Sequence, residues 1–365
     1  MTAAIAFGRA APADEADIRR LLRENPLGGA WSVALEREPD GFGGPHLPGE
    51  RQDFIIARDT ATGAAVGLCE RVVRPAWVGG EQVALPYLGA LRVAASHRHR
   101  IAVLKGGFAA LRDQCEQAGD YPAALTSITA DNSPARRVLT AGLKGLPRYF
   151  PLGDFSSLAI RPRAASGDSA VAAVTAEELP QLAAFLRTEL QRRDCAPVWT
   201  AQGLAALAGA RFLALREGGR ILASIALWDQ RASRQAVLAD CPRAVRSARP
   251  AINLLAPLLR LPRIPARGET IRQGFLSHLA VSEDDPAAML RMVRAGLALA
   301  HRAGLDSAVI GVPADHPWRP AIRAALRTIE YRTSLFGVVW PDAPDVASAI
   351  AQIAPQRVFP EIGLL

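Results

Sequence analysis

Lysine, paired cysteine and long apolar runs are scarce or missing in this sequence, and each absence argues against a class of protein. Only Lys105 and Lys144 are lysines, so the formal net charge of +8 comes from scattered arginines and not from a polybasic tail. We therefore expect no nucleic-acid partner. The four cysteines stand far apart, with no C-x-x-C pair and no Cys/His cluster, which predicts reduced, buried thiols and no metal site.

No run of about eighteen apolar residues occurs, and the first residues contain no basic segment followed by an apolar stretch. We therefore expect a cytoplasmic protein without a membrane partner. The chain has 365 residues, and half of them are apolar. This length exceeds one ordinary hydrophobic core and predicts two domains.

The order of the expected elements occurs twice. APADEADIRRLLREN, a helix with an acidic first turn, recurs in style as VTAEELPQLAAFLRTEL, and the hairpin DFIIARDTATGAAVGLCERVV recurs as RFLALREGGRILASIALW. A third block then occurs in both copies. In the first copy it consists of YLGALRV, a helix, AG, a strand and ADN, and in the second copy of FLSHLAV, a helix, AG, a strand and ADH. Val93 thus matches Val281 and Asp131 matches Asp315, at offsets of 188 and 184. An ancient duplication explains this order.

Each copy of the longest predicted helix has one apolar stripe at helical spacing. In the first copy, the stripe ends before Gly119 and consists of Ile101, Leu104, Phe108, Leu111 and Cys115. In the second copy, it ends before Gly304 and consists of Met289, Val293, Leu297 and Ala300. We therefore predict two domains, residues 1–160 and 172–365, joined by the small, polar linker 161–171. The second contains an insertion at about residues 232–271, which we expect to form a helical excursion on the surface.

This element order resembles the GNAT acyltransferase superfamily. As in that family, the sequence begins with a helix and a meander of strands. A strand that opens into a helix through the basic turn SHRHR comes next, and then a strand that leads into a helix after Asn132. The segment 142–160 is similar to its closing strands. The resemblance implies an α/β (α+β) protein with two GNAT-like domains, each a mixed, mostly antiparallel sheet flanked by helices.

The resemblance also implies acetyl-CoA or another acyl-CoA as cofactor, held in the first domain. The residues that fall on the family's cofactor site are the strand end Leu91, Arg92 and Val93, the turn Arg98, His99, Arg100, Ile101 and Ala102, and Asn132 with its N-x-x-A spacing. Two departures stand out. Ile101 and Val103 occupy positions where the family has small residues, and in the second copy the acidic turn SEDDP replaces SHRHR and disfavours an anion there.

The usual catalytic side chains of the family are missing, because YLGALRV contains no carboxylate and Leu139 stands where many members have a tyrosine. Tyr149, Tyr87 and Glu70 are the candidate replacements. Tyr149 and Tyr87 are equally compatible with aromatic packing on strands. Glu70 shares a face with Leu68 and Val72. Burial there would raise the pKa of Glu70 and make it a base, although a salt bridge is the more usual outcome.

We therefore predict an acyl-CoA-dependent N-acyltransferase, in the first place an N-acetyltransferase, that acts on a small-molecule or peptide amine. Two alternatives remain open. One is a non-catalytic tandem GNAT-fold protein that binds another ligand between its halves. The other is an aminoacyl-tRNA-dependent transferase, although the long helical arms of such enzymes have no counterpart in this sequence. Replacing Arg98 and Arg100 would separate the enzyme from the binding protein.

Overall fold

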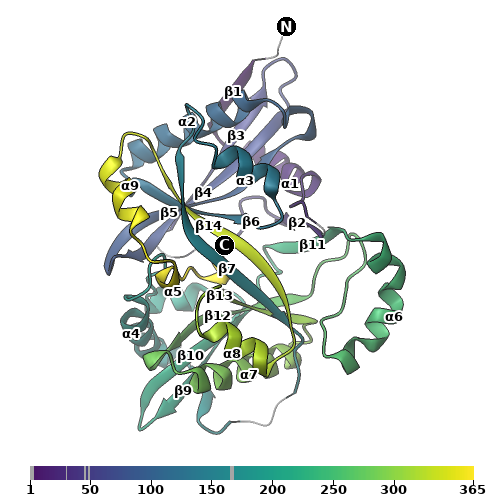
Figure 1. Cartoon of the computed structure of the whole chain (residues 1–365), viewed down its shortest axis with the longest axis vertical. Coiled ribbons are helices and arrows are strands. Elements are labelled where there is room, and N and C mark those ends of the chain that lie inside the picture. Colours follow the sequence, from purple (N-terminus) through teal and green to yellow (C-terminus); the bar gives the residue numbers. More distant parts are fainter. Residues whose placement is uncertain (1–3, 30, 45–46, 48–49, 165–167) are drawn as a thin grey trace.

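The computed structural model describes residues 4–29, 31–44, 47, 50–164 and 168–365. Within these residues, twelve strands form one continuous sheet in the order β1-β3-β4-β5-β6-β14-β7-β13-β12-β10-β9-β8, and β2 pairs separately with β11. The first half of the chain forms one end of this sheet and the second half the other (Figure 1). The mixed, mostly antiparallel sheet flanked by helices confirms the predicted fold class.

The first half follows the predicted order of elements. Its elements are β1 (Ile5–Arg9), α1 (Glu15–Glu24), β2 (Ser32–Glu36), β3 (Arg51–Asp59), β4 (Ala65–Val78), β5 (Glu81–Val93), α2 (Ile101–Ala118), β6 (Ala123–Thr129), α3 (Ser133–Leu139) and β7 (Arg148–Ile160). Helix α1 lies on one face of the sheet with Leu68 and Phe54, and α2 packs on the opposite face with Ile55 and Leu88.

The second half repeats this order with additions. Its elements are β8 (Val171–Ala173), α4 (Leu179–Leu190), α5 (Ala201–Ala206), β9 (Ala210–Glu217), β10 (Arg220–Trp228), β11 (Gln235–Asp240), α6 (Arg243–Leu259), β12 (Gln273–Val281), α7 (Pro286–Arg302), β13 (Ser307–Pro313), α8 (Trp318–Ala325), β14 (Thr328–Val339) and α9 (Pro344–Ala351). None of the helices in the described part of the chain combines the length and the apolarity needed to cross a membrane.

The two long helices show why the apolar stripes predict burial well but not completely. In α7, all four stripe residues are buried, and Gly304 with a φ of +65° follows the helix. In α2, Phe108 and Leu111 are buried and Gly119 caps the helix in the left-handed conformation. Ile101, in contrast, is 40% exposed at the first turn, and Val103 takes its place against the sheet. The prediction for Ile101 is wrong because α2 begins at that residue.

The last strands of the two halves are exchanged. Strand β14 pairs with β6, from Thr333 opposite Thr129 to Val339 opposite Ala123, so a strand of the second half completes the sheet of the first. Strand β7 likewise pairs with β13 of the second half. The segment 142–160 therefore contributes one strand that reaches across the molecule, and not the several closing strands that the resemblance implied. The strands of the two halves are therefore hydrogen-bonded to one another in one continuous sheet.

Gly311 allows the exchange to be tested, because it lies on β13 where Phe155 of β7 crosses it. A Cβ atom added at Gly311 would stand 2.4 Å from the Phe155 ring. We expect Gly311→Ala to lower the free energy of unfolding by about 2 kcal/mol, measured by urea denaturation, through overpacking of this contact. Gly8→Ala is the matched control, because an added Cβ there meets no atom within 4 Å. Equal stability of both variants would contradict the packing of β7 on β13.

The insertion at about residues 232–271 contains a strand as well as the predicted helix. Strand β11 pairs with β2 of the first half, from Gln235 opposite Glu36 to Asp240 opposite Ser32. The amide group of Gln235 also binds the backbone N–H and C=O of Glu38. Helix α6 follows and lies at the outer edge of the molecule (Figure 1).

Candidate functional site

Strands β5 and β6 diverge in the middle of the sheet. They pair in parallel only at Tyr87 opposite Leu125 and Leu88 opposite Thr126. Beyond these pairs, the backbone of β5 that faces β6 has no strand partner among the described residues. This edge includes Leu91, Arg92 and Val93, the strand end predicted to hold the cofactor, and its Leu91 and Val93 carbonyls accept hydrogen bonds from the side chains of Arg92 and Arg98. Free N–H and C=O groups at such an edge can pair with an extended, amide-containing chain.

A bulge marks the divergence in both halves of the chain. The pairing of β4 with β5 shifts between Leu68 and Glu70, and Ala90 on β5 has a φ of +49°. In the second half, the pairing of β10 with β12 shifts between Ser224 and Ala226, and His278 has a φ of +53°. Ala90 and His278 are 188 positions apart, the same offset as Val93 and Val281. The duplication therefore extends to an uncommon backbone conformation.

The basic turn between β5 and α2 is partly engaged in internal contacts. The Arg98 guanidinium donates to the Asn25 side chain at 2.9 Å and to the Val93 carbonyl at 3.2 Å. His97 is buried, and its Nδ1 lies 2.8 Å from the Ser96 hydroxyl. Arg100 differs, because its buried Nη1 atom has no hydrogen-bond partner in the described structure. Arg100 is therefore an arginine of this turn whose hydrogen-bonding capacity is not fully used.

The start of α2 faces solvent. The side chains of Ile101 and Ala102 are exposed, whereas Val103 is buried beside Ala57 and Gly67. Val103 therefore lies beneath the helix and does not cover its end, which relieves part of the crowding expected there. The first amides of an α-helix have no intrahelical partner, and the helix dipole favours negative charge beside them. Together with Arg100, the amides at Ile101 and Ala102 can hold a phosphate group.

Glu70 lies on the α1 face of the sheet within a buried polar cluster. It accepts hydrogen bonds from Arg37 at 2.5 Å and from Gln52 at 2.6 Å. Burial alone would raise the pKa of Glu70, but the charges of Arg37 and Arg234 and the bond from Gln52 lower it below its usual value. Of the two outcomes that the sequence left open for Glu70, the structure shows the salt-bridged carboxylate and not the base with a raised pKa. Glu70 is an ionised counter-ion and a weak base.

Tyr87 projects from the same face at the point where the strands diverge. Its hydroxyl lies 2.7 Å from the Ser127 hydroxyl on β6, so the two side chains bridge the strands. Arg92 is buried nearby, its Nη1 donates to the Leu91 carbonyl, and its Nε has no partner among the described groups. Burial lowers the pKa of Arg92 to about 10. Tyr87, Ser127 and Arg92 therefore line the α1 side of the gap.

Tyr149 lies on the opposite face, at the start of β7. Its ring packs edge-on against Phe336 of β14, with centroids 5.9 Å apart. Burial, with a smaller contribution from Cys69, raises the pKa of Tyr149, so the hydroxyl stays protonated. No described residue hydrogen-bonds to this hydroxyl, which borders an open pocket with Arg136 and Arg137 of α3. The structure therefore brings Glu70 and Tyr87 together on one face and places Tyr149 on the other.

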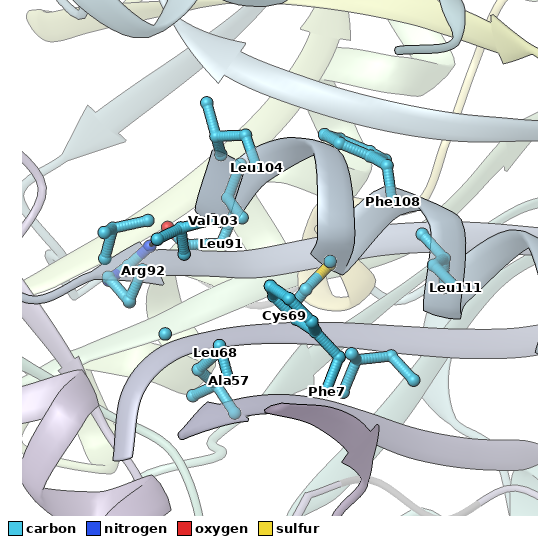
Figure 2. Close-up of a pocket in the computed structure, with 14 residues that line it drawn as sticks. Phe7, Ala57, Leu68, Cys69, Leu91, Arg92, Val103, Leu104, Phe108 and Leu111 are labelled. Carbon is cyan, nitrogen blue, oxygen red and sulfur yellow. Dashed lines mark hydrogen bonds between the residues drawn. The ribbon is translucent and has the colours of Figure 1, made fainter. Parts of the chain in front are cut away.

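An apolar pocket lies between α2 and the sheet (Figure 2). Its cavity is small, about 30 Å³, and it opens to solvent. Its lining includes the free strand edge at Leu91 and Val93, Cys69 of β4, and Leu104, Gly107 and Phe108 of α2. Burial raises the pKa of the Cys69 thiol to about 12, so this thiol is uncharged. The pocket therefore lies beneath α2, over β3, β4 and the end of β5.

Asn132 begins α3 as predicted. Its side-chain oxygen accepts a hydrogen bond from the Ala135 amide at 3.3 Å, which confirms its role as the helix cap. Asp285 caps α7 in the same way, accepting from the Ala287 and Ala288 amides. Asp284 of the same turn pairs with Arg192 and Arg193. The acidic turn of the second half is thus engaged with its own helix, as its sequence predicts.

The strand gap of the second half is filled. The ring of His278, at the bulge, packs among Trp199, Phe212 and Trp228, and burial lowers its pKa to about 3. Glu361, from the last described segment, accepts a hydrogen bond from the His278 amide at 2.8 Å. Aromatic side chains therefore occupy the region that corresponds to the open gap of the first half.

Glu361 predicts a pH dependence of stability. Burial raises its pKa from 4.5 to about 7, so the folded state binds this proton more tightly than the unfolded state. Its contribution to stability is therefore complete below about pH 4.5 and is lost as pH rises to about 7, by about 3 kcal/mol. We expect Glu361→Gln to remove this loss, so that the variant gains stability relative to the wild type between pH 5 and 8 in urea denaturation. If the free energies of unfolding of the variant and the wild type changed in parallel with pH, the Glu361 carboxyl would not be buried with a raised pKa.

Solved structures share the whole fold. N-myristoyltransferase of Saccharomyces cerevisiae with bound myristoyl-CoA matches 91% of this chain and 82% of its own, with a TM-score of 0.59 and 12% identity. A GCN5-related N-acetyltransferase from Sphaerobacter thermophilus matches 92% of this chain and 96% of its own, with a TM-score of 0.52 and 12% identity. No family model and no curated protein matches the sequence. The likeness establishes the fold: this is a tandem GNAT-fold chain.

Proposed function

We propose that this protein is an acyl-CoA-dependent N-acyltransferase whose cofactor binds in the first half of the chain. The observation that carries the proposal is the open gap between β5 and β6, which leads to the exposed start of α2. The counterpart gap of the second half is filled by aromatic side chains around His278, and its turn is acidic. The solved neighbours with the same fold include an enzyme with bound myristoyl-CoA, which supports this ligand class.

The backbone and the basic turn supply the proposed cofactor contacts. The strand end Leu91, Arg92 and Val93 offers backbone groups without a strand partner on the β6 side to the pantetheine arm, which contains two amides. The Leu91 and Val93 carbonyls would share or exchange the hydrogen bonds that they accept from Arg92 and Arg98. The amides of Ile101 and Ala102 and the side chain of Arg100 hold the pyrophosphate. The other predicted contacts, Arg98, His99 and Asn132, lie around this path, where Arg98 and Asn132 fix the turn and the start of α3.

The chemistry that we propose divides between the two faces of the sheet. The acceptor amine approaches from the α1 face, past Tyr87 and Ser127, and attacks the thioester carbonyl. The C–N bond forms and the C–S bond breaks, and Tyr149 protonates the departing thiolate from the α3 face. The proton that the acceptor nitrogen loses passes through solvent and restores the Tyr149 phenol. Glu70 keeps Arg37 in place and does not act as the base. The proposed acceptor is a small-molecule or peptide amine. We also keep the proposed division of the chain into a first domain, residues 1–160, a linker, residues 161–171, and a second domain, residues 172–365.

The apolar pocket supports an acyl chain longer than acetyl. The sequence favoured acetyl-CoA, but the narrow space beneath α2 borders the strand end at Leu91 and Val93 and is lined by apolar side chains. An acetyl group would leave this space empty, whereas a longer chain that enters and widens it would remove apolar surface from water. We therefore propose a medium or long acyl-CoA as the donor, with its chain between Cys69 and Phe108.

Gly107 provides a test of the acyl pocket. It faces the pocket from α2, and a Cβ atom added there meets nothing within 4 Å. We expect Gly107→Leu to weaken binding of decanoyl-CoA at least about tenfold relative to acetyl-CoA, measured by calorimetry, because the new side chain fills the space of the acyl chain. The substitution should also stabilise the helix by up to about 1 kcal/mol.

Gly107→Ala is the matched control, since it removes the same glycine but adds only one methyl group. Its preference among acyl-CoA donors should stay close to that of the wild type. Unchanged chain-length preference in Gly107→Leu would place the acyl chain elsewhere. If the wild type bound no acyl-CoA at millimolar concentration, the proposed function itself would fail.

A further inference from the structure

Helix α6 exposes four leucines. The exposed fractions are 81% for Leu254 and 80% for Leu258, with 48% for Leu255 and 41% for Leu259. Spacings of one and four residues place these side chains on one side of the last two turns of the helix. Single exposed leucines are normal on protein surfaces, but four adjacent ones on one helix end form a contiguous apolar patch.

The other side of α6 is hydrogen-bonded to the loop that follows it. The Asn253 side chain donates to the Ile264 carbonyl at 2.9 Å and accepts from the Ile264 amide at 2.8 Å. Ala256 is also buried, on the same side of the helix as Asn253. The helix stands at the outer edge of the molecule, beyond β11 (Figure 1). The four leucines therefore lie exposed on the side of α6 that does not face this loop.

Positive charge surrounds the leucine patch. Residues 240–270 contain six arginines and two acidic residues, a net charge of 6 − 2 = +4, which is half of the +8 of the whole chain. Arg246 pairs with Asp240, and Arg263 lies 3.9 Å from Glu269. Within the described ranges, no acidic side chain lies within ion-pair distance of Arg243, Arg260 or Arg267, and all three are exposed. Arg260 directly follows Leu259 at the end of the helix.

We propose that α6 docks this protein on an anionic lipid surface. Leucines on one helix face together with arginines at the helix ends are the features with which amphipathic helices enter the headgroup region of a bilayer. Apolar burial and attraction to anionic lipids add, at about 1 kcal/mol, or about fivefold in binding, for each arginine near the surface. This proposal departs from the expectation of no membrane partner, and the exposure of the four leucines is the reason.

The insertion connects α6 to the first half of the chain. Strand β11 leads into α6 and pairs with β2. Arg234, directly before β11, lies beside the Glu70 cluster and lowers the pKa of Glu70. A docked α6 would therefore hold the α1 side of the strand gap at a fixed distance from the membrane. The docking itself does not depend on the proposed function.

Co-sedimentation of the full chain with vesicles tests this proposal. We expect binding to vesicles of equal parts phosphatidylglycerol and phosphatidylcholine, weak binding to phosphatidylcholine alone, and release at high salt. Leu254→Gln with Leu258→Gln should lower binding about tenfold or more, with unchanged thermal unfolding because both side chains are exposed. Leu143→Gln, at an exposed leucine in the first half, is the matched control and should bind like the wild type.

Three results would overturn the docking. The first is no binding to the anionic vesicles at low salt. The second is equal binding of the wild type and the double leucine variant, which would show that the leucine patch does not face the lipid. The third is a dimer in light scattering that the double variant abolishes, which would make a second copy of the chain the occupant of the patch.

Discussion

Tyr149→Phe is expected to lower the turnover number for acyl transfer about 100-fold, with little change in the Michaelis constant for acyl-CoA. The reason is that the phenol is the proposed source of the proton for the departing thiolate. The hydroxyl makes no hydrogen bond to a described residue, so its removal should leave stability unchanged. Steady-state kinetics with detection of free CoA, together with urea denaturation, would measure both effects.

Tyr331→Phe is the matched control for this experiment. Tyr331 lies on β14, like the Phe336 that packs against Tyr149, but its side chain is exposed on the other face. Its substitution should leave the turnover number within about twofold of the wild type. Equal turnover of Tyr149→Phe and wild type would make Tyr149 a packed aromatic only. Because burial raises the pKa of Tyr149, the rate should also show no loss from its deprotonation in the usual range of tyrosine.

Arg37→Met is expected to lower the free energy of unfolding by about 3 kcal/mol, because it leaves the buried Glu70 carboxylate without its closest cation. The pKa of Glu70 should rise in the variant, since the charge of Arg37 is what chiefly opposes the effect of burial. Urea denaturation at pH 7 and at pH 5 would measure both changes. The deficit should shrink at pH 5, where Glu70 of the variant takes up a proton.

Two further variants control for the loss of an arginine. Arg51→Met removes an exposed arginine from the neighbouring β3, where Asp120 keeps Arg71 as its partner, and should cost less than about 1 kcal/mol. The double variant Arg37→Met with Glu70→Gln should be more stable than Arg37→Met alone, because no buried charge is left unpaired. A double variant that is less stable than the single one would refute the ion pair as the reason.

The sequence predicts the fold to the extent that local patterns determine it. The repeat of strand, helix, strand and helix fixed the order of elements, and the offset of 188 residues also matches the two bulges at Ala90 and His278. Helix ends followed from caps such as Asn132 and Gly119. The exchange of β7 and β14 was not predictable, because either strand offers a similar apolar pattern to either half. The choice depends on packing such as that of Phe155 against Gly311.

The candidate site was predictable only where it consists of backbone. The strand end at Leu91 and the helix start at Ile101 follow from a strand that runs into a helix, and the structure places both at the gap. The sequence could not decide between a raised pKa and a salt bridge for Glu70, because Arg37 and Arg234, which lower its pKa, come from segments far away in the sequence. The pairing of Tyr87 with Ser127 likewise depends on a contact between strands 40 positions apart. No local pattern signals either contact.

Hydrogen–deuterium exchange with and without decanoyl-CoA tests the central claim, that the first half alone holds the cofactor. We expect slower exchange at the amides of Leu91, Val93, Ile101 and Ala102 when the ligand is present. We expect no change in the corresponding strand end and turn of the second half, residues 279–288. Protection at residues 279–288, or no protection at the β5 edge and the start of α2 at saturating ligand, would contradict it.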